Sequence, residues 1–301
     1  MALEKVGIVF PGGDPAEVEA LEQLGYDSVW SGEHILYHGP TLDALVVLAA
    51  YAARTERLKV GSSVLLLPLR PPALVAKAAA TLDLLSGGRL ILGVGVGGEY
   101  PPEFGALGIP LAERGARADE ALTILKLLWA GGPVSFEGRF YRLPGVRLEP
   151  PPAQPGGPPV WVGGRSRAAR RRAGRLGDGW FPYLVDPEQY RAGRREVEAY
   201  RAEAGRDGPF TWALLLFIRC DDDPAEARRV AAERLGRMYA RPFDGLVDRY
   251  CACGPPEACA ERIKQFEAAG VEYLVLSPVA PPEELLAQAV RYSAEVLPRL
   301  R

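Results

Sequence analysis

The chain has few residues of several kinds, and each shortage excludes a class of protein. Among 301 residues there are only two histidines and four cysteines. Two histidines are too few for a hydrolase-type metal centre. Four cysteines without a second C-x-x-C pair or a nearby histidine form neither a zinc site nor a secreted disulfide framework. We therefore expect no bound metal.

Lysine is also scarce, and no lysine lies where a nucleophile would be needed. Lys5 and Lys59 precede predicted strands, whereas Lys77, Lys126 and Lys264 lie within predicted helices. A Schiff-base enzyme forms its covalent intermediate on a lysine of the site. The sequence therefore argues against a Schiff-base aldolase.

Long apolar runs and a large charge excess are absent as well. No run reaches the roughly 18 to 20 apolar residues of a membrane span, and the first residues lack the pattern of a signal peptide. The formal net charge of −2 gives no general attraction to nucleic acid or to an anionic membrane. We expect a cytoplasmic protein that acts on a small-molecule substrate.

Short β-branched runs alternate with longer segments of helical period, which is typical of βαβ units and a parallel sheet. We predict strands at residues 5–10, 27–32, 58–65, 89–96, 159–164, 177–182, 213–220 and 271–278. Eight strands, each followed by a helix, favour a (β/α)8 TIM barrel. An open doubly wound sheet is the alternative, because a strand count from one sequence is easily wrong by one.

One segment, residues 131–159, breaks this alternation. It has no helical period and is dense in glycine and proline. We expect a surface insertion with a short hairpin, placed before the fifth strand. Because neither side of it looks self-contained, residues 1–301 are predicted to form a single domain.

The helix after the second strand can be placed from its apolar spacing. Leu42, Leu45, Val46 and Ala49 repeat at helical spacing, and Thr41 precedes them as a candidate cap. We expect these four apolar side chains on the buried face of the helix.

The carboxyl ends of the strands are where such a barrel gathers its reactive groups. Glu33 and His34 follow the second strand, and an imidazole with an unperturbed pKa of about 6.5 can exchange a proton near neutral pH. The alternative is a histidine that only hydrogen-bonds at a loop entrance. His38 is expected to be an ordinary loop residue, because Gly39 and Pro40 disfavour the helix that two metal-binding histidines four apart would need.

The glycine-rich stretch at residues 93–98, GVGVGG, follows the fourth strand and matches the dinucleotide-binding pattern G-x-G-x-x-G. The paired Pro101 and Pro102 argue against a helix continuing from its last glycine. We expect its glycines, Gly97 among them, to let a flat ligand lie against bare backbone. Glu99 is a second candidate for proton transfer, with an exposed loop carboxylate as the alternative.

The stretch from Gly163 to Ser166 is the strongest signal for an anion. A predicted strand runs into Gly163 and Gly164, and Arg165 and Ser166 precede a predicted helix. Backbone N–H groups, a hydroxyl and a guanidinium therefore gather at one spot, where a phosphate would fit. Most arginines of the helix itself are expected to form a solvated surface.

Four blocks of sequence together carry a family resemblance. They are LGYDSVWSGEH, GSSVLLLPLRPPALVAKAAATLDLLSGGRLILGVGVGGEYPPEFGALG, PPVWVGGRSRAARRRAGRLGDGWFP and GPPEACAERIKQFEAAGVEYLVLSP. With these blocks in order along nearly the whole chain, the sequence resembles the bacterial luciferase-like monooxygenase superfamily, and more closely its coenzyme F420-dependent branch. The resemblance implies a (β/α)8 barrel, a homodimer and a flavin-type ring over the carboxyl ends of the strands.

The resemblance also implies roles for particular residues. It places a non-prolyl cis peptide between Ser63 and Val64, behind the ring. It matches residues 163–166 with a phosphate-binding turn, and it matches Glu33 and His34 with an acidic-His pair beside the ring.

The implied function is hydride transfer between coenzyme F420 and a small organic substrate, with His34 and either Glu33 or Glu99 handling the accompanying proton. Two alternatives stay open. One is an FMN-dependent monooxygenase that receives reduced flavin from a separate reductase. The other is a non-catalytic carrier of a flavin or deazaflavin.

Overall fold

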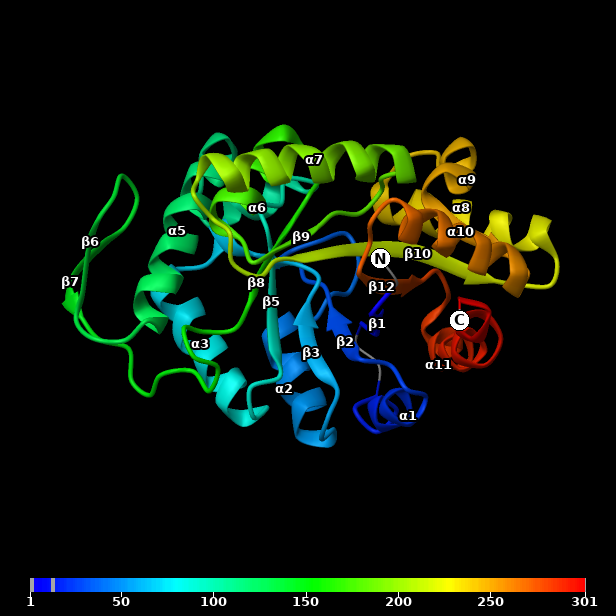
Figure 1. The fold of residues 1–301 in the computed structure, drawn as a ribbon, viewed down its shortest axis with the longest axis horizontal. Helices are drawn as coiled ribbons and strands as arrows, with labels where there is room; N and C mark the ends of the chain where they lie inside the picture. The colour runs from blue at the N-terminus through cyan, green and yellow to red at the C-terminus, as the bar shows by residue number, and fades with distance from the viewer. Residues whose placement is uncertain (1–2, 12–13, 301) are drawn as a thin grey trace.

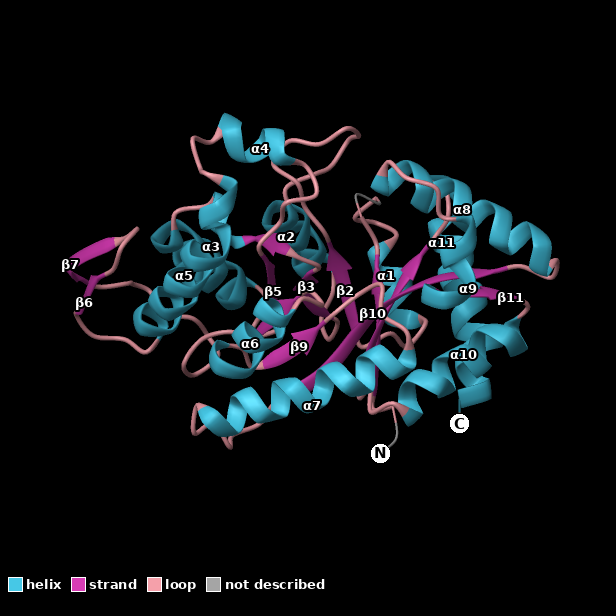
Figure 2. Ribbon diagram, turned by 90° about the horizontal axis from the view of Figure 1, so that it is seen from above, coloured by secondary structure: helices cyan, strands magenta, loops and turns pink. Residues whose placement is uncertain are grey.

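The computed structural model describes residues 3–11 and 14–300, and its centre is a closed barrel of parallel strands (Figures 1 and 2). The eight barrel strands are β1 (Lys5–Val9), β2 (Ser28–Ser31), β3 (Lys59–Ser62), β5 (Leu90–Gly95), β8 (Val160–Gly163), β9 (Gly179–Phe181), β10 (Thr211–Cys220) and β12 (Tyr273–Pro278). The ring closes because β10 pairs with both β9 and β12, and β12 pairs with β1. The predicted TIM barrel is confirmed, with a strand at each predicted position.

Helices surround this barrel on its outer side (Figure 2). The helices are α1 (Val18–Gln23), α2 (Ala44–Arg54), α3 (Pro72–Leu85), α4 (Pro101–Ala106), α5 (Arg114–Trp129), α6 (Arg167–Leu176), α7 (Pro187–Glu203), α8 (Pro224–Tyr239), α9 (Val247–Tyr250), α10 (Pro256–Ala268) and α11 (Leu285–Arg291). None of the described helices is long and apolar enough to span a bilayer. Since all barrel strands are parallel, their carboxyl ends and the loops that follow them meet at one face.

Four further strands lie outside the ring. Strand β4 (Leu65–Leu66) pairs with β5, and β11 (Cys251–Gly254), which the sequence did not predict, pairs with the far half of β10. Strands β6 (Val134–Glu137) and β7 (Arg142–Val146) form the hairpin predicted within residues 131–159. Figure 1 shows this hairpin projecting at one edge of the molecule, beyond α5.

Aromatic side chains fill the inside of the barrel. Trp30 and Trp161 stack with their ring centroids 5.1 Å apart, and Phe181 packs 5.0 Å from Trp30. Glycines on neighbouring strands make room for the two indoles, because a Cβ on Gly61 or on Gly179 would overlap a tryptophan ring. The interior is therefore a packed core and not a pore.

The buried face of α2 differs from the predicted one. Asp43, not Thr41, caps this helix, and its carboxylate accepts hydrogen bonds from the amides of Leu45 and Val46 at 3.0 and 3.2 Å. Leu45 is buried, but Val46 and Leu42 are 69% and 56% exposed. The prediction was wrong for these two residues, because a nearly continuous apolar run fits more than one helical face.

Candidate active site

His34 lies just beyond β2 at the mouth of the barrel, and its partner is a residue that the sequence did not single out. The Nδ1 atom of His34 is 3.2 Å from Oε1 of Glu103, whose side chain is fully buried. The other oxygen of Glu103 accepts a hydrogen bond from the amide of Ile35 at 3.3 Å. One buried carboxylate therefore fixes both the imidazole and the backbone beside it, and Nε2 of His34 has no hydrogen-bond partner among the described residues.

Glu103 reaches this position because it is the third residue of the short helix α4. Pro101 and Pro102 occupy the first turn of this short helix, where a missing N–H costs nothing. As expected, no helix continues from Gly98, because α4 begins only at Pro101. The dinucleotide-fold interpretation of the glycine motif still fails, because β5 belongs to a closed barrel and not to an open sheet.

Glu33 is tied to an arginine and not to its neighbour His34. Arg70 donates from Nη2 to Oε2 of Glu33 at 2.7 Å and from Nε to Oε1 at 3.2 Å, and the amide of Leu66 donates to Oε1 at 3.0 Å. Arg70 also contacts Asp43 at 2.6 Å. Burial raises the pKa of Glu33 and Arg70 opposes that rise. No hydrogen bond joins Glu33 to His34 in the described structure. The contacts of Glu33 instead anchor the loop in which it lies.

Glu99 and the 163–166 turn are linked through a tyrosine that follows β9. The hydroxyl of Tyr183 donates to Oε1 of Glu99 in a short hydrogen bond, and the Arg165 guanidinium lies 5.4 Å from the centre of the Tyr183 ring. Burial, and then the neighbouring Glu99 carboxylate, raise the pKa of Tyr183. The loops after β5, β8 and β9 thus meet at one place.

Tyr37 closes the other side of this mouth. Its ring stacks on the His34 imidazole with a centroid separation of 3.9 Å and an angle of 12°. Tyr100 and His38 pack against it at 5.8 and 4.4 Å. The Tyr37 hydroxyl donates to the carbonyl of Met238 at 2.5 Å, which joins the loop after β2 to the end of α8. His38 is exposed and packs against the rings of Tyr37 and Tyr100, as expected of a loop residue.

The predicted cis peptide between Ser63 and Val64 is present at the end of β3. Val64 lies close to two glycines, since a Cβ on Gly95 would come 2.5 Å from Val64 and a Cβ on Gly163 would come 3.1 Å from it. The Ser63 hydroxyl oxygen is buried and has no hydrogen-bond partner among the described residues. A flat ring lying over this bulge would bring a polar atom of its edge within hydrogen-bond distance of the Ser63 hydroxyl. The residues therefore fit a flavin or a deazaflavin.

The turn from Gly163 to Ser166 has the features of an anion site. Gly164 has a φ of 104°, and Ser166 caps α6 by accepting a hydrogen bond from the amide of Ala169 at 3.2 Å. In the described structure the amides of Arg165 and Ser166 have no acceptor, and Arg165 has no carboxylate within ion-pair distance. These donors at a helix N-terminus fit the phosphate of a cofactor tail. Gly97 stands in the neighbouring loop with a φ of 63°, and a Cβ there would come 3.3 Å from Leu66 and 3.4 Å from Phe104.

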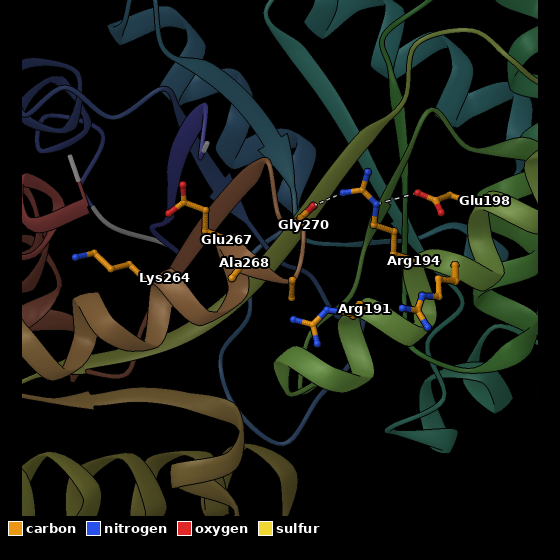
Figure 3. A pocket seen from close by; sticks show the side chains of 9 residues that line it. Arg191, Arg194, Glu198, Lys264, Glu267, Ala268 and Gly270 are labelled. Atoms are coloured by element: carbon orange, nitrogen blue, oxygen red, sulfur yellow. Dashed lines mark hydrogen bonds and ion pairs between the residues drawn. The ribbon is translucent and has the colours of Figure 1, made fainter. Parts of the chain in front are cut away.

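A separate surface hollow of about 590 Å³ lies between α7 and α10, beside the start of β12 (Figure 3). Its arginine Arg194 donates to Glu198 at 2.9 Å and to the carbonyl of Gly270 at 2.7 Å. The hollow contains none of the groups described above. Because Gly270 precedes β12, it lies toward the amino-terminal end of the barrel, opposite the mouth.

The model of the luciferase-like monooxygenase family matches residues 15–273 of this chain. The chain belongs to the luciferase-like monooxygenase family. This family member is 42% identical to an uncharacterized protein of Mycobacterium tuberculosis. That match covers 57% of this chain and 58% of the relative. It is 31% identical to an F420-dependent glucose-6-phosphate dehydrogenase of Nakamurella multipartita, over 94% of this chain and 90% of the relative.

Among solved structures, this luciferase-like chain resembles monooxygenase RslO1 from Streptomyces bottropensis. The TM-score is 0.84 and the identity is 27%, with 99% of this chain and 100% of the other chain covered. The relatives thus include an F420-dependent dehydrogenase and a monooxygenase.

Sequence reasoning missed three residues at the mouth, namely Glu103, Tyr37 and Tyr183. Tyr183 stands two residues after β9, so inspection of every strand end would have found it. Glu103 stands at the third position of a helix that two prolines begin, which is a recognisable pattern. No sequence pattern places Tyr37 on the His34 ring, because that contact depends on the path of the loop.

Proposed function

We propose that this protein is an F420-dependent oxidoreductase that transfers a hydride between the deazaflavin and a small organic substrate. The observation that carries the proposal is His34, held through Nδ1 by the buried Glu103 at the same mouth as the free amides of Arg165 and Ser166. The likeness to F420-dependent glucose-6-phosphate dehydrogenase over nearly the whole chain supports the choice of cofactor.

The residues present would hold the two ends of such a cofactor. The 163–166 turn would bind the phosphate of its tail, and the bulge at Ser63 and Val64, with the bare backbone at Gly97, would support its ring. When bound, the deazaflavin supplies a ring carbon that accepts or gives up a hydride. The barrel orients that ring toward His34.

The proton that accompanies hydride transfer is assigned to His34. Nδ1 faces the Glu103 carboxylate, so Nε2 is the nitrogen that can take a proton from a substrate hydroxyl or return it. The Glu103 carboxylate fixes the ring orientation. Glu99, bonded to Tyr183, is the second proton-handling candidate, and Glu33 is a supporting residue, because Arg70 already holds both of its oxygens.

Cofactor titration tests the choice of cofactor. We expect F420 to quench tryptophan fluorescence in a saturable way, with FMN binding at least tenfold more weakly. Gly163→Ala should weaken F420 binding, because the added Cβ would come 3.1 Å from Val64 beneath the ring. Tight binding of FMN with none of F420 would refute the proposal.

The alternative of an FMN-dependent monooxygenase is favoured by the structural likeness to monooxygenase RslO1. Such an enzyme would receive reduced flavin from a separate reductase. A third possibility, a carrier without catalysis, is tested by His34→Ala. That variant should keep F420 binding and lose turnover if the protein is an enzyme.

We also propose a homodimer, through the outer face of α2 and α3. Val46, Leu74 and Leu85 are 69%, 66% and 71% exposed on these adjacent helices, and Leu42 extends the patch. Sedimentation of the purified protein should give a dimer, and Val46→Asp should shift it toward monomer. A monomeric wild-type protein would contradict this. Action in the cytoplasm remains an expectation from the sequence.

A further inference from the structure

The loops around the mouth are acidic, and their few cations are already engaged. In the loops that directly follow the eight barrel strands, up to the next helix of the outer ring, the only basic residues are Arg70 and Arg165. Arg70 is bound to Glu33 and Asp43. The same loops contribute Glu99 and Glu103, among other carboxylates.

Arg165 belongs to the anion turn and is taken up by the cofactor phosphate if the proposed function holds. The next arginine to consider is Arg241, near the end of α8. Its guanidinium lies against the rings of Tyr239 and Phe243 at 5.9 and 5.6 Å. A sugar phosphate is a dianion at neutral pH, and its recognition requires several convergent cations or free amides. Apart from Arg165, the described mouth offers two arginines, and they belong to separate segments. Arg241 follows α8, whereas Arg114 begins α5, lies against Gly98 and has a buried Nε without a hydrogen-bond partner among the described residues.

The mouth is instead lined by rings. Tyr37 and Tyr100 stand on the His34 side, at 5.8 Å from each other. Tyr183, which follows β9, and Tyr239, the last residue of α8, form a second pair, with their rings 18° from parallel and 6.4 Å apart. The four tyrosines are partly exposed, so each still presents apolar ring surface to a ligand. The hydrogen bond from Tyr37 to Met238 joins the two pairs, because Met238 precedes Tyr239.

We propose that the substrate is an uncharged alcohol, or the corresponding carbonyl compound, with a ring or another bulky apolar body, and that it is not a sugar phosphate. This inference rests on the proposed function. The substrate body packs between the tyrosine pairs, and its hydroxyl faces Nε2 of His34. In the oxidation, the carbinol C–H bond breaks and its hydride passes to the oxidised deazaflavin. The O–H proton passes to His34, and the C–O bond becomes a carbonyl.

The test compares cyclohexanol and 1-phenylethanol with glucose 6-phosphate. F420 binding is measured first, by fluorescence, so that loss of cofactor binding identifies a failure of the proposed function. Binding of each compound to the F420-loaded protein is then measured by calorimetry, and turnover by bleaching of the deazaflavin absorbance. We expect at least one ring alcohol to bind and to be oxidised, and glucose 6-phosphate to do neither.

Two variants on the same segment separate ring packing from charge recognition. Tyr239→Leu should weaken ring-alcohol binding about three- to tenfold, because it removes an aromatic face, whereas Arg241→Ala should change it less than twofold. Oxidation of glucose 6-phosphate by the F420-loaded protein would overturn the proposal, and its loss in Arg241→Ala would assign phosphate recognition to that arginine. F420 binding without binding of either ring alcohol would also overturn the proposal.

Discussion

Replacement of Glu103 by Gln tests the central pair of the site most directly. In the wild-type protein the two carboxylate oxygens of Glu103 lie 3.2 Å from Nδ1 of His34 and 3.3 Å from the backbone amide of Ile35. The glutamine side chain has the same shape, so its oxygen can still accept one of these two hydrogen bonds. What disappears is the charge. A hydrogen bond to a charged group contributes about 1 to 1.5 kcal/mol more than a neutral one, which corresponds to roughly a tenfold fall in kcat.

The assay follows bleaching of F420 by a substrate, together with F420 affinity and the unfolding midpoint. We expect Glu103→Gln to lower kcat about tenfold and to leave cofactor affinity within twofold. His34→Ala should lower kcat by about 10²- to 10⁴-fold, and adding Glu103→Gln to it should cost little more, because both residues act through one imidazole. Wild-type kcat in Glu103→Gln, or a loss that adds fully to that of His34→Ala, would refute the reasoning.

Three further predictions concern stability. Arg70→Ala should lower the free energy of unfolding by about 3 to 5 kcal/mol, because it leaves the buried Glu33 without its cation, and adding Glu33→Gln should restore part of the loss in urea titrations. Burial alone would raise the pKa of Asp186, but hydrogen bonds from a backbone amide of α7 and from a nearby guanidinium outweigh burial and lower that pKa. The ionised Asp186 therefore stabilises the fold above its unfolded pKa of 3.8. Asp186→Asn should therefore cost about 0.5 kcal/mol at pH 7, and the difference should vanish as the pH falls through the folded pKa; a gap that persists in acid would contradict this. Gly93→Ala should cost at least about 1 to 3 kcal/mol in thermal unfolding, since its Cβ would overlap a carbonyl of β3, whereas Gly105→Ala, which meets nothing within 4 Å, is the matched control.

The barrel was predictable because its signal is distributed along the whole chain. Each strand is a short β-branched run between turn residues, and all eight runs were found, so the count favoured the closed barrel over an open sheet. Strand β11 was missed because Cys251–Gly254 has too little β-branched or aromatic character, and it forms only by extending the long β10. The face of α2 was misassigned because exposed apolar residues, such as Val46, and core residues give the same periodicity.

The site was predictable only as far as local sequence determines it. His34 and the 163–166 turn stand at strand ends, and a parallel barrel brings strand ends together. The partner of His34 was not predictable in this way, because Glu33 is adjacent in sequence while Glu103 is 69 residues away. Adjacent residues of an extended segment point in opposite directions, so Glu33 turns to Arg70 when His34 faces the mouth.

Under the proposed function, the hydrogen bond between Tyr37 and Met238 connects substrate choice with proton transfer. It joins residues 201 positions apart and holds the ring that stacks on His34. A sequence change at the end of α8 would therefore act on two properties together: the ring surface that receives the substrate, and the position of the imidazole that takes its proton. This link limits how far the substrate can change during evolution, because the segment after α8 cannot be exchanged freely without also disturbing His34.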